Sequence, residues 1–187
     1  MTHPITRLNV GSGRNVKPGW VNLDMAPLPG IDVVRDILRP PYPFASESFD
    51  YILCSHVLEH VPQIVNGKDG LLTVLTELCR ILKPGGTMEV RGPHPRIGIA
   101  YFNNPTHYRV ITQWTFDSFV GKRKAGSVEV CKAAFWTEIS FSKMEVKSAA
   151  FIDPPFNSDI LAGLMRRVPI LSRVLGRPAE LVIYLTK

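Results

Sequence analysis

Two glycines and a carboxylate near the start of the chain have a spacing that suggests ligand binding. An apolar stretch over 8–10 runs directly into Gly11-Ser12-Gly13, and Asp24 ends a second apolar run eleven residues after Gly13. Glycine lets a ligand approach the backbone closely, because no Cβ blocks it. A carboxylate at the end of the next strand can accept hydrogen bonds from two ribose hydroxyls. The pattern therefore indicates a nucleoside-binding crevice at the carboxyl edge of a parallel sheet.

The loop after these glycines is short. The dinucleotide fingerprint has a third glycine that opens a helix, and the N-terminus of that helix receives the pyrophosphate. Here Val16 holds the third position, Pro18-Gly19 follows, and the next strand begins near Trp20, so the helix between the first two strands is predicted to be short or absent. A nucleoside without phosphate, such as S-adenosylmethionine, fits this loop better than NAD.

Later segments place further groups at the same edge. The β-branched run 31–37 contains Asp36, whose carboxylate can receive an adenine amino group. A fourth strand over 48–56 leads into Glu59-His60, and leucines at helical spacing predict a helix over about 69–82 that ends at Pro84-Gly85. Further strands are expected at 87–90, near 134–151 and at 180–186.

This ordered set of segments resembles the class I S-adenosylmethionine-dependent methyltransferases. The resemblance covers 7–93 and is carried by VGSG, NLDM, VVRDI, SFDYILCSHVLEHV and ELCRILKPGGTMEV. It is similar to the methyltransferases of small molecules, sugars and lipids in which a Glu-His pair follows strand four. It implies a Rossmann-like α/β fold, with a seven-stranded, mainly parallel sheet whose last strand is antiparallel. It also implies S-adenosyl-L-methionine as cofactor and S-adenosyl-L-homocysteine as product.

The resemblance also implies which residues bind the cofactor. The glycine loop would contact the cofactor, Asp24 would bind the ribose, Asp36 the adenine, and the end of strand four would lie by the methionine moiety. Arg14 could pair with the cofactor carboxylate. The full set is Val10, Gly11, Ser12, Gly13, Arg14, Asp24, Met25, Asp36, Ile37, Ser55 and His56.

Two histidines are candidates for taking a proton from the acceptor. His60 lies just past strand four, beside the crevice, and His107 lies in a polar segment where this family builds its substrate wall. Histidine suits this task because its ordinary pKa is about 6.5. The alternative for His60 is a structural role on a short apolar helix.

Two other motifs suggest different chemistry. His56-x-x-Glu59-His60 has the letters of an inverted zinc-peptidase motif, but it begins at a strand end and meets Pro62, so no metal site is predicted. Asp153-Pro154-Pro155-Phe156 has the letters of an amino-methyltransferase motif but lies far from strand four. An ordinary proline turn is therefore predicted there, and amino-methylation of DNA or protein is disfavoured.

The length of 187 residues fits a single methyltransferase domain over 1–187. Its expected parts are a cofactor-binding core (7–93), an aromatic-rich, substrate-facing insertion (94–130) and C-terminal strands with an apolar and basic segment (131–187). Thr112 is expected to cap a helix in the insertion. The three cysteines are far apart in sequence, which favours reduced, buried thiols.

The net charge of +6 is unevenly placed, because residues 1–60 carry five basic and six acidic side chains. Clusters at 122–124 and 166–177 could meet an acidic substrate, nucleic acid or an anionic membrane surface, or could form a solvated face. The segment 159–175 could rest on a membrane, although a cover for the sheet is favoured. No long apolar run and no secretory signal is visible, so a cytoplasmic protein without a transmembrane segment is predicted.

Together these observations predict an enzyme that methylates a small-molecule, sugar or lipid-linked acceptor by in-line displacement. Two alternatives stay open. The missing first helix leaves the substrate side minimal, so the chain could be a non-catalytic cofactor-binding partner subunit. The basic C-terminal half could instead serve a nucleic-acid methyltransferase, whose binding would depend steeply on salt.

Overall fold

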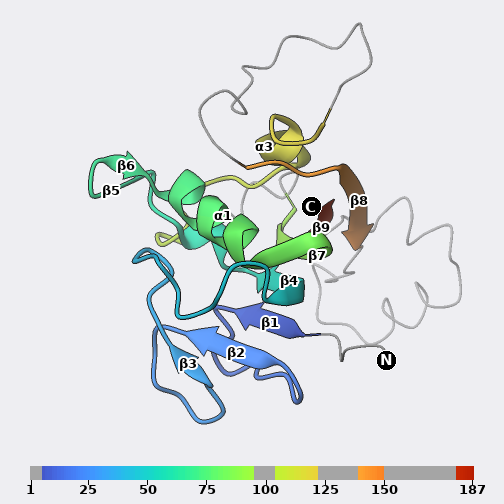
Figure 1. Cartoon of the computed structure of the whole chain (residues 1–187). Helices are drawn as coiled ribbons and strands as arrows, with labels where there is room; N and C mark the ends of the chain where they lie inside the picture. Colours follow the sequence, from blue (N-terminus) through green and yellow to red (C-terminus); the bar gives the residue numbers. More distant parts are fainter. Residues whose placement is uncertain (1–5, 95–103, 122–138, 150–179) are drawn as a thin grey trace, which may run out of the picture.

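The computed structural model describes residues 6–94, 104–121, 139–149 and 180–187, which form a seven-stranded sheet with the order β3-β2-β1-β4-β7-β9-β8 (Figure 1). The strands are β1 (Arg7–Val10), β2 (Val21–Asp24), β3 (Val33–Val34), β4 (Phe49–Ser55), β7 (Leu82–Pro93), β8 (Lys143–Ala149) and β9 (Glu180–Thr186). The first five are parallel, and β9 runs antiparallel to both of its neighbours. The predicted fold class is confirmed, including the antiparallel last strand.

Between β4 and β7 the chain forms a short 3₁₀ helix, η1 (Leu58–His60), a hairpin of β5 (Ile64–Val65) and β6 (Lys68–Asp69), and α1 (Gly70–Ile81). Asp69 is the N-cap of α1, and its side chain accepts a hydrogen bond from the Leu72 N–H at 2.9 Å. The helix therefore lies where its leucine spacing predicted. A shorter helix, α3 (Gln113–Asp117), begins after Thr112, whose N–H donates to Thr115 Oγ1 at 3.0 Å.

One face of the sheet is apolar and packs against α1. Strand pairing aligns two rows of buried residues across four strands, and each of these residues is at most 2% exposed. One row is Leu8, Ile52, Met88 and Leu185, and the next row along the strands is Val10, Cys54, Val90 and Ile183. Leu75 and Leu78 of α1 are fully buried in the same core cluster. Cys54 and Cys79 are buried free thiols, as expected, and Cys131 lies outside the described residues.

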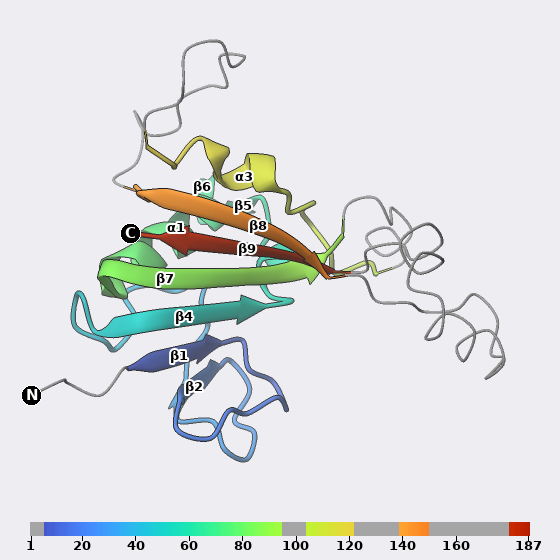
Figure 2. The ribbon, with the colours of Figure 1, turned by 90° about the vertical axis from the view of Figure 1, so that its right-hand side faces the viewer.

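The other face of the sheet is polar, and it carries no helix among the described residues (Figure 2). Alternate positions in the strands hold Tyr51, Glu89, Tyr184 and Glu145, which strand pairing places on the same face. A parallel sheet covered on both faces has nearly continuous apolar strands, whereas alternation indicates one solvated face. The crossovers after β1 and β2 contribute no helix to this face.

Two buried asparagines hold the loop that connects β1 to β2 without a helix. Asn9 and Asn22 are 3% and 2% exposed, and Asn9 Nδ2 donates to Asn22 Oδ1 at 3.0 Å. Asn22 also accepts the Lys17 N–H at 2.9 Å and donates to the Lys17 carbonyl at 3.1 Å. The loop over 11–20 is thus tied to the sheet by hydrogen bonds to buried amides, which explains how so short a crossover is stable.

Several sequence predictions fall outside the described residues. These include Lys122-Arg123-Lys124, the Asp153–Phe156 motif, the arginines of 166–177, and Tyr101 and Phe102 of the insertion. Strand β8 lies within the region 134–151 where a strand was expected, and β9 matches 180–186. No helix of the described part is long and apolar enough to cross a membrane.

Candidate functional site

A pocket of about 240 Å³ opens at the carboxyl ends of the central strands. Ligands in open α/β sheets bind at this edge. Strands β2 and β3 lie on one side of β1, and β4 lies on the other side. The pocket therefore has two chemically different ends. Carboxylates follow β2 and β3, and histidines follow β4. Its lining is Gly11, Leu23, Asp24, Met25, Arg35, Asp36, Ile37, Leu38, His56, Val57, His60 and Val61.

The glycine loop after β1 has two distinct requirements for glycine. Gly11 and Gly13 both adopt positive φ, at 60° and 51°. A Cβ on Gly11 would lie 2.5 Å from Val57 Cγ2, whereas a Cβ on Gly13 would meet nothing within 4 Å. Gly11 lines the pocket, but a side chain at this position would collide with Val57. At Gly11 the space is filled by Val57, and at Gly13 it is open.

Asp24 is fixed over this loop by backbone donors. Its Oδ2 accepts the Gly13 N–H at 2.8 Å and its Oδ1 accepts the Ala26 N–H at 2.9 Å. Each carboxylate oxygen can accept more than one hydrogen bond, so both remain able to bind a hydroxyl. The geometry fits a carboxylate that is oriented before a ribose arrives.

The segment after β3 forms the far wall of this end. Asp36 Oδ1 accepts the Leu38 N–H at 2.9 Å, which folds the wall back on itself. The hydroxyl of the buried Tyr42 donates to the Ile37 carbonyl at 2.9 Å. Arg35, which also lines the pocket, donates to the Arg39 and Pro41 carbonyls at 2.7 and 3.0 Å. The wall that was expected to meet adenine is therefore held by hydrogen bonds from within its own loop.

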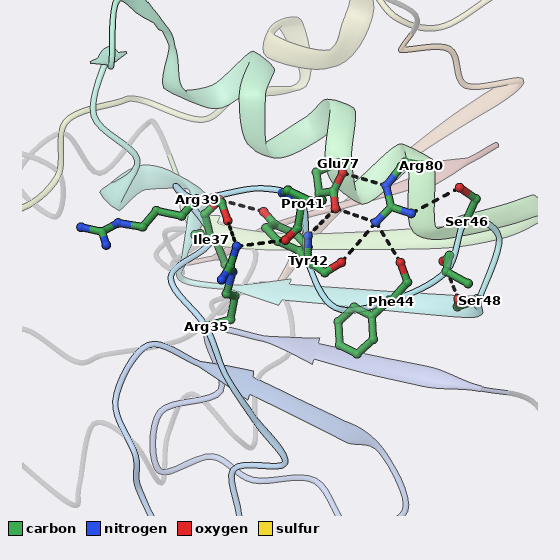
Figure 3. A network of polar contacts seen from close by, with 11 residues as sticks. Arg35, Ile37, Arg39, Pro41, Tyr42, Phe44, Ser46, Ser48, Glu77 and Arg80 are labelled. Atoms are coloured by element: carbon green, nitrogen blue, oxygen red, sulfur yellow. Dashed lines mark hydrogen bonds and ion pairs between the residues drawn. The ribbon is translucent and has the colours of Figure 1, made fainter.

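Helix α1 anchors this wall through a buried carboxylate (Figure 3). Glu77 accepts the Tyr42 N–H at 2.6 Å and pairs with Arg80 at 2.6 Å. Arg80 also donates to the Phe44 carbonyl at 2.9 Å. Burial alone would raise the pKa of Glu77, but the hydrogen bonds from Arg80 and from the Tyr42 N–H outweigh it and lower the pKa. Glu77 is thus held ionised beneath the loop.

At the other end, His60 packs against the segment that carries His107. His60 Nδ1 lies 3.1 Å from the Thr106 carbonyl and 3.0 Å from Thr106 Oγ1. A carbonyl only accepts, so Nδ1 carries the proton and neutral His60 keeps its lone pair on Nε2. The rings of His60 and His107 meet edge to face at 4.7 Å. The two predicted catalytic histidines are therefore brought together, and His60 lines the pocket.

His56 is held between two carboxylates. Its Nδ1 lies 3.3 Å from Glu59 Oε1, and its Nε2 lies 3.1 Å from Glu180 Oε1. The contact with Glu59 raises the pKa of His56, burial of the ring opposes this, and Glu180 adds to the increase. Glu59 is 1% exposed, and its backbone carbonyl accepts the N–H groups of Tyr108 and Arg109 at 2.8 and 3.2 Å.

Glu59, His60 and His107 bring possible metal-ligand atoms within 4.8 Å of one another. The hydrogen bonds around them do not favour a metal. Asn104 Oδ1 accepts the Thr106 N–H at 3.0 Å, which directs the Asn104 amide nitrogen to His107 Nε2 at 3.2 Å. That donor occupies the lone pair of Nε2 and places the proton of neutral His107 on Nδ1. The set therefore does not offer three free ligand atoms.

The predicted site residues divide into two groups. Those that line the pocket are Gly11, Asp24, Met25, Asp36, Ile37, His56 and His60. The others do not line it: Val10 and Ser12 are buried, Arg14 is exposed, Ser55 ends β4, and Gly13 and His107 lie outside the lining. Sequence reasoning gave no site role to Glu59 or Glu180. Glu59 was visible in the Glu-His pair, but nothing in the sequence links Glu180 to strand four.

Several features of the pocket fit S-adenosylmethionine. The buried Ser12 hydroxyl has no hydrogen-bond partner among the described residues, and the space beside Gly13 is open. Asp24 and Asp36 supply acceptors for hydroxyl and amino groups, and no helix N-terminus follows β1 to bind a phosphate. These features fit an adenine nucleoside that lacks phosphate.

Comparison with known proteins agrees with this fit. Residues 14–90 match the family model of the methyltransferase domain. The matched segment is similar to methyltransferase domains. It contains Asp24, Asp36 and the three residues of η1, and it supports both the predicted enzyme class and S-adenosylmethionine as the cofactor. A search of curated proteins gave no match.

Solved methyltransferases share the fold over nearly the whole chain. An S-adenosylmethionine-dependent methyltransferase of Archaeoglobus fulgidus is 15% identical, with a TM-score of 0.61 over 98% of this chain and 86% of its own. One from Thermotoga maritima is 16% identical, with a TM-score of 0.58 over 100% and 84%. A Haloferax volcanii protein, solved in complex with the methyltransferase activator Trm112, is 16% identical, with a TM-score of 0.56 over 97% and 82%. At these identities the likeness shows the fold.

Proposed function

We propose that this protein transfers a methyl group from S-adenosylmethionine to an N–H or O–H group of a small-molecule, sugar or lipid-linked acceptor. The observation that carries the proposal is a single pocket with carboxylates at one end and histidines at the other. The carboxylate end suits the adenosine part. The histidine end suits an acceptor that must lose a proton.

When bound, the cofactor supplies an activated methyl group on a sulfonium, and the acceptor displaces S-adenosylhomocysteine in line. Asp24 would orient the ribose, and Asp36 with Ile37 would hold the adenine. Val57 and Val61 line the pocket and are buried, so they limit water at the reacting end. The protein's contribution is alignment, desolvation and a path for the acceptor's proton.

The acceptor would enter beside the segment over 104–109. Tyr108 is 53% exposed there, while its N–H is fixed to Glu59. An exposed aromatic ring at the mouth of a site suits a sugar or aryl group. His60 and His107 remain the candidates from the sequence for taking the acceptor's proton, and their edge-to-face contact keeps both near this entrance.

Calorimetry with S-adenosylmethionine, S-adenosylhomocysteine and NAD tests the cofactor half. We expect binding of the first two and none of NAD. A panel of labelled-methyl transfer assays with benzylamine, catechol and glucosamine then tests the acceptor half. Binding of none of the nucleosides would contradict the proposal, and binding without turnover would favour a partner subunit. Steeply salt-dependent binding of RNA would point to a nucleic-acid substrate instead.

A further inference from the structure

His56 has a strained backbone at the end of β4. Its φ is 55°, in the left-handed region that residues other than glycine seldom adopt, and its N–H donates to the Arg91 carbonyl at 2.9 Å. Such strain gathers at functional sites, because the surrounding structure must stabilise it. The ring lines the pocket, and its side chain is 50% exposed. A cofactor contact alone does not explain why this residue is held so firmly.

A buried carboxylate orients the His56 ring. Glu59 Oε1 lies 3.3 Å from Nδ1, and neither oxygen of this carboxylate accepts a hydrogen bond from the described residues. A carboxylate so buried is costly unless a charged or hydrogen-bonding partner compensates it. The hydrogen bond of the His56 ring is at Nε2, which lies 3.1 Å from Glu180 Oε1. In neutral His56 a proton on Nδ1 would compensate the more deeply buried Glu59, and Nε2 would then be the proton-accepting atom. A carboxylate beside Nδ1 also orients the general base in serine hydrolases.

Glu180 lies at Nε2, where a proton would arrive and leave. Its side chain is 23% exposed, against 1% for Glu59, so it can exchange protons with water. Contacts with carboxylates at both nitrogens correspond to the imidazolium form. The charged groups on the elements around His56 are Glu59 on η1, Glu180 on β9 and Arg91 on β7.

We infer that His56, and not His60 or His107, accepts the acceptor's proton, with Glu59 as its positioning residue and Glu180 as the route of that proton to solvent. The inference rests on the proposed methyl transfer. The acceptor's N–H or O–H bond breaks and its proton moves to His56 Nε2. The new bond forms to the methyl carbon, and sulfur keeps the electron pair of the broken S–CH₃ bond. The proton then passes to the Glu180 carboxylate and to water.

His60 lacks the feature that favours His56. The group behind its Nδ1 is the neutral Thr106 carbonyl, whereas the group behind His56 is a carboxylate. Only a carboxylate stabilises the imidazolium by a full opposite charge. His60 and His107 then form the acceptor wall, held by Thr106 and Asn104.

An NMR titration of the full chain with bound S-adenosylhomocysteine tests the pairing. We expect the His56 ring to titrate above pH 6.5, with the midpoint lowered in Glu59→Gln and lowered less in Glu180→Gln. Glu145→Gln, an exposed carboxylate on β8, is the matched control and should leave the midpoint unchanged. A wild-type midpoint at or below 6.5, or no change in Glu59→Gln, would overturn the inference.

Methyl transfer to the panel of benzylamine, catechol and glucosamine tests the chemistry. His56→Gln should lose about 100-fold or more in turnover at saturating S-adenosylmethionine, the range of general-base catalysis. The wild-type rate should fall as pH drops through the His56 midpoint, and in Glu59→Gln that fall should occur at lower pH. Full turnover by His56→Gln overturns the inference but leaves the proposed function intact. Failure of the wild type to bind S-adenosylhomocysteine would contradict the proposed function itself.

Discussion

The two ends of the pocket are formed by contacts between residues at very different separations in the sequence. At the carboxylate end, Asp24 is held by backbone groups at Gly13 and Ala26, eleven and two residues away. At the histidine end, His60 meets Thr106 across 46 residues, and His56 meets Glu180 across 124. The first end is therefore formed by neighbouring strands and their loops, whereas the second forms only when distant segments pack. The comparison separates a cofactor end from an acceptor end.

The largest expected effect comes from the glycine loop, where Gly11→Ala and Gly13→Ala form a matched pair. Both substitutions strain a positive φ, but only the one at Gly11 also forces a Cβ to within 2.5 Å of Val57. We expect Gly11→Ala to lower the free energy of unfolding by about 3 kcal/mol and Gly13→Ala by about 1 kcal/mol. Urea denaturation measures both values. Equal losses would mean that Val57 moves aside.

The loop after β3 is the exception to a locally built cofactor end, because Glu77 reaches Tyr42 across 35 residues. Glu77→Gln should lower the free energy of unfolding by about 2 kcal/mol at pH 7, since Arg80 and the Tyr42 N–H lose their charged acceptor. Thermal unfolding at several pH values measures this loss.

The same variant gives a pH signature. The folded protein lowers the pKa of Glu77, so its carboxylate contributes stability above the ordinary glutamate pKa of about 4.3. That contribution is lost as pH falls through the lower, folded value. The difference between wild type and Glu77→Gln should therefore shrink in acid. A difference that stayed constant to pH 3 would show that packing, and not charge, holds the loop.

A smaller effect is expected from Tyr42→Phe, which removes the hydrogen bond from the hydroxyl to the Ile37 carbonyl and keeps the buried ring. The loss should be about 1 kcal/mol in stability, with a few-fold weaker binding of S-adenosylhomocysteine. Calorimetry with the nucleoside adenosine separates the causes. Adenosine should lose the same factor if the wall contacts adenine, and no loss for either ligand would remove Ile37 from the cofactor site.

The same difference in range explains what the sequence could predict. Helix α1 followed from the spacing of Leu71, Leu75 and Leu78, and the missing first helix from the few residues between Gly13 and Trp20. The alternation of polar and apolar residues over 143–147 indicates a polar sheet face, but no prediction was drawn from it. The contact between Gly11 and Val57 was not predictable from local patterns, because Val57 is 46 residues away and packs there through the fold.

The acceptor end was beyond local patterns for the same reason. The Glu-His pair after β4 was visible, but the carboxylate that faces His56 from β9 has no sequence neighbourhood in common with it. His107 was placed correctly on the acceptor side because it follows the fifth strand, whereas its hydrogen bond from Asn104 required coordinates. Strand order is thus predictable from the sequence, but side-chain partners across the sheet edge are not.

Calorimetric titration of S-adenosylhomocysteine into Asp24→Ala and Glu59→Gln, beside the wild type, tests the division of the pocket most directly. We predict that Asp24→Ala weakens binding at least about tenfold, because charge-assisted hydrogen bonds to the ribose are lost. Glu59→Gln should bind within about twofold of the wild type while its His56 midpoint falls. Unchanged binding in Asp24→Ala, or an equal loss in Glu59→Gln, would contradict the division into a cofactor end and an acceptor end.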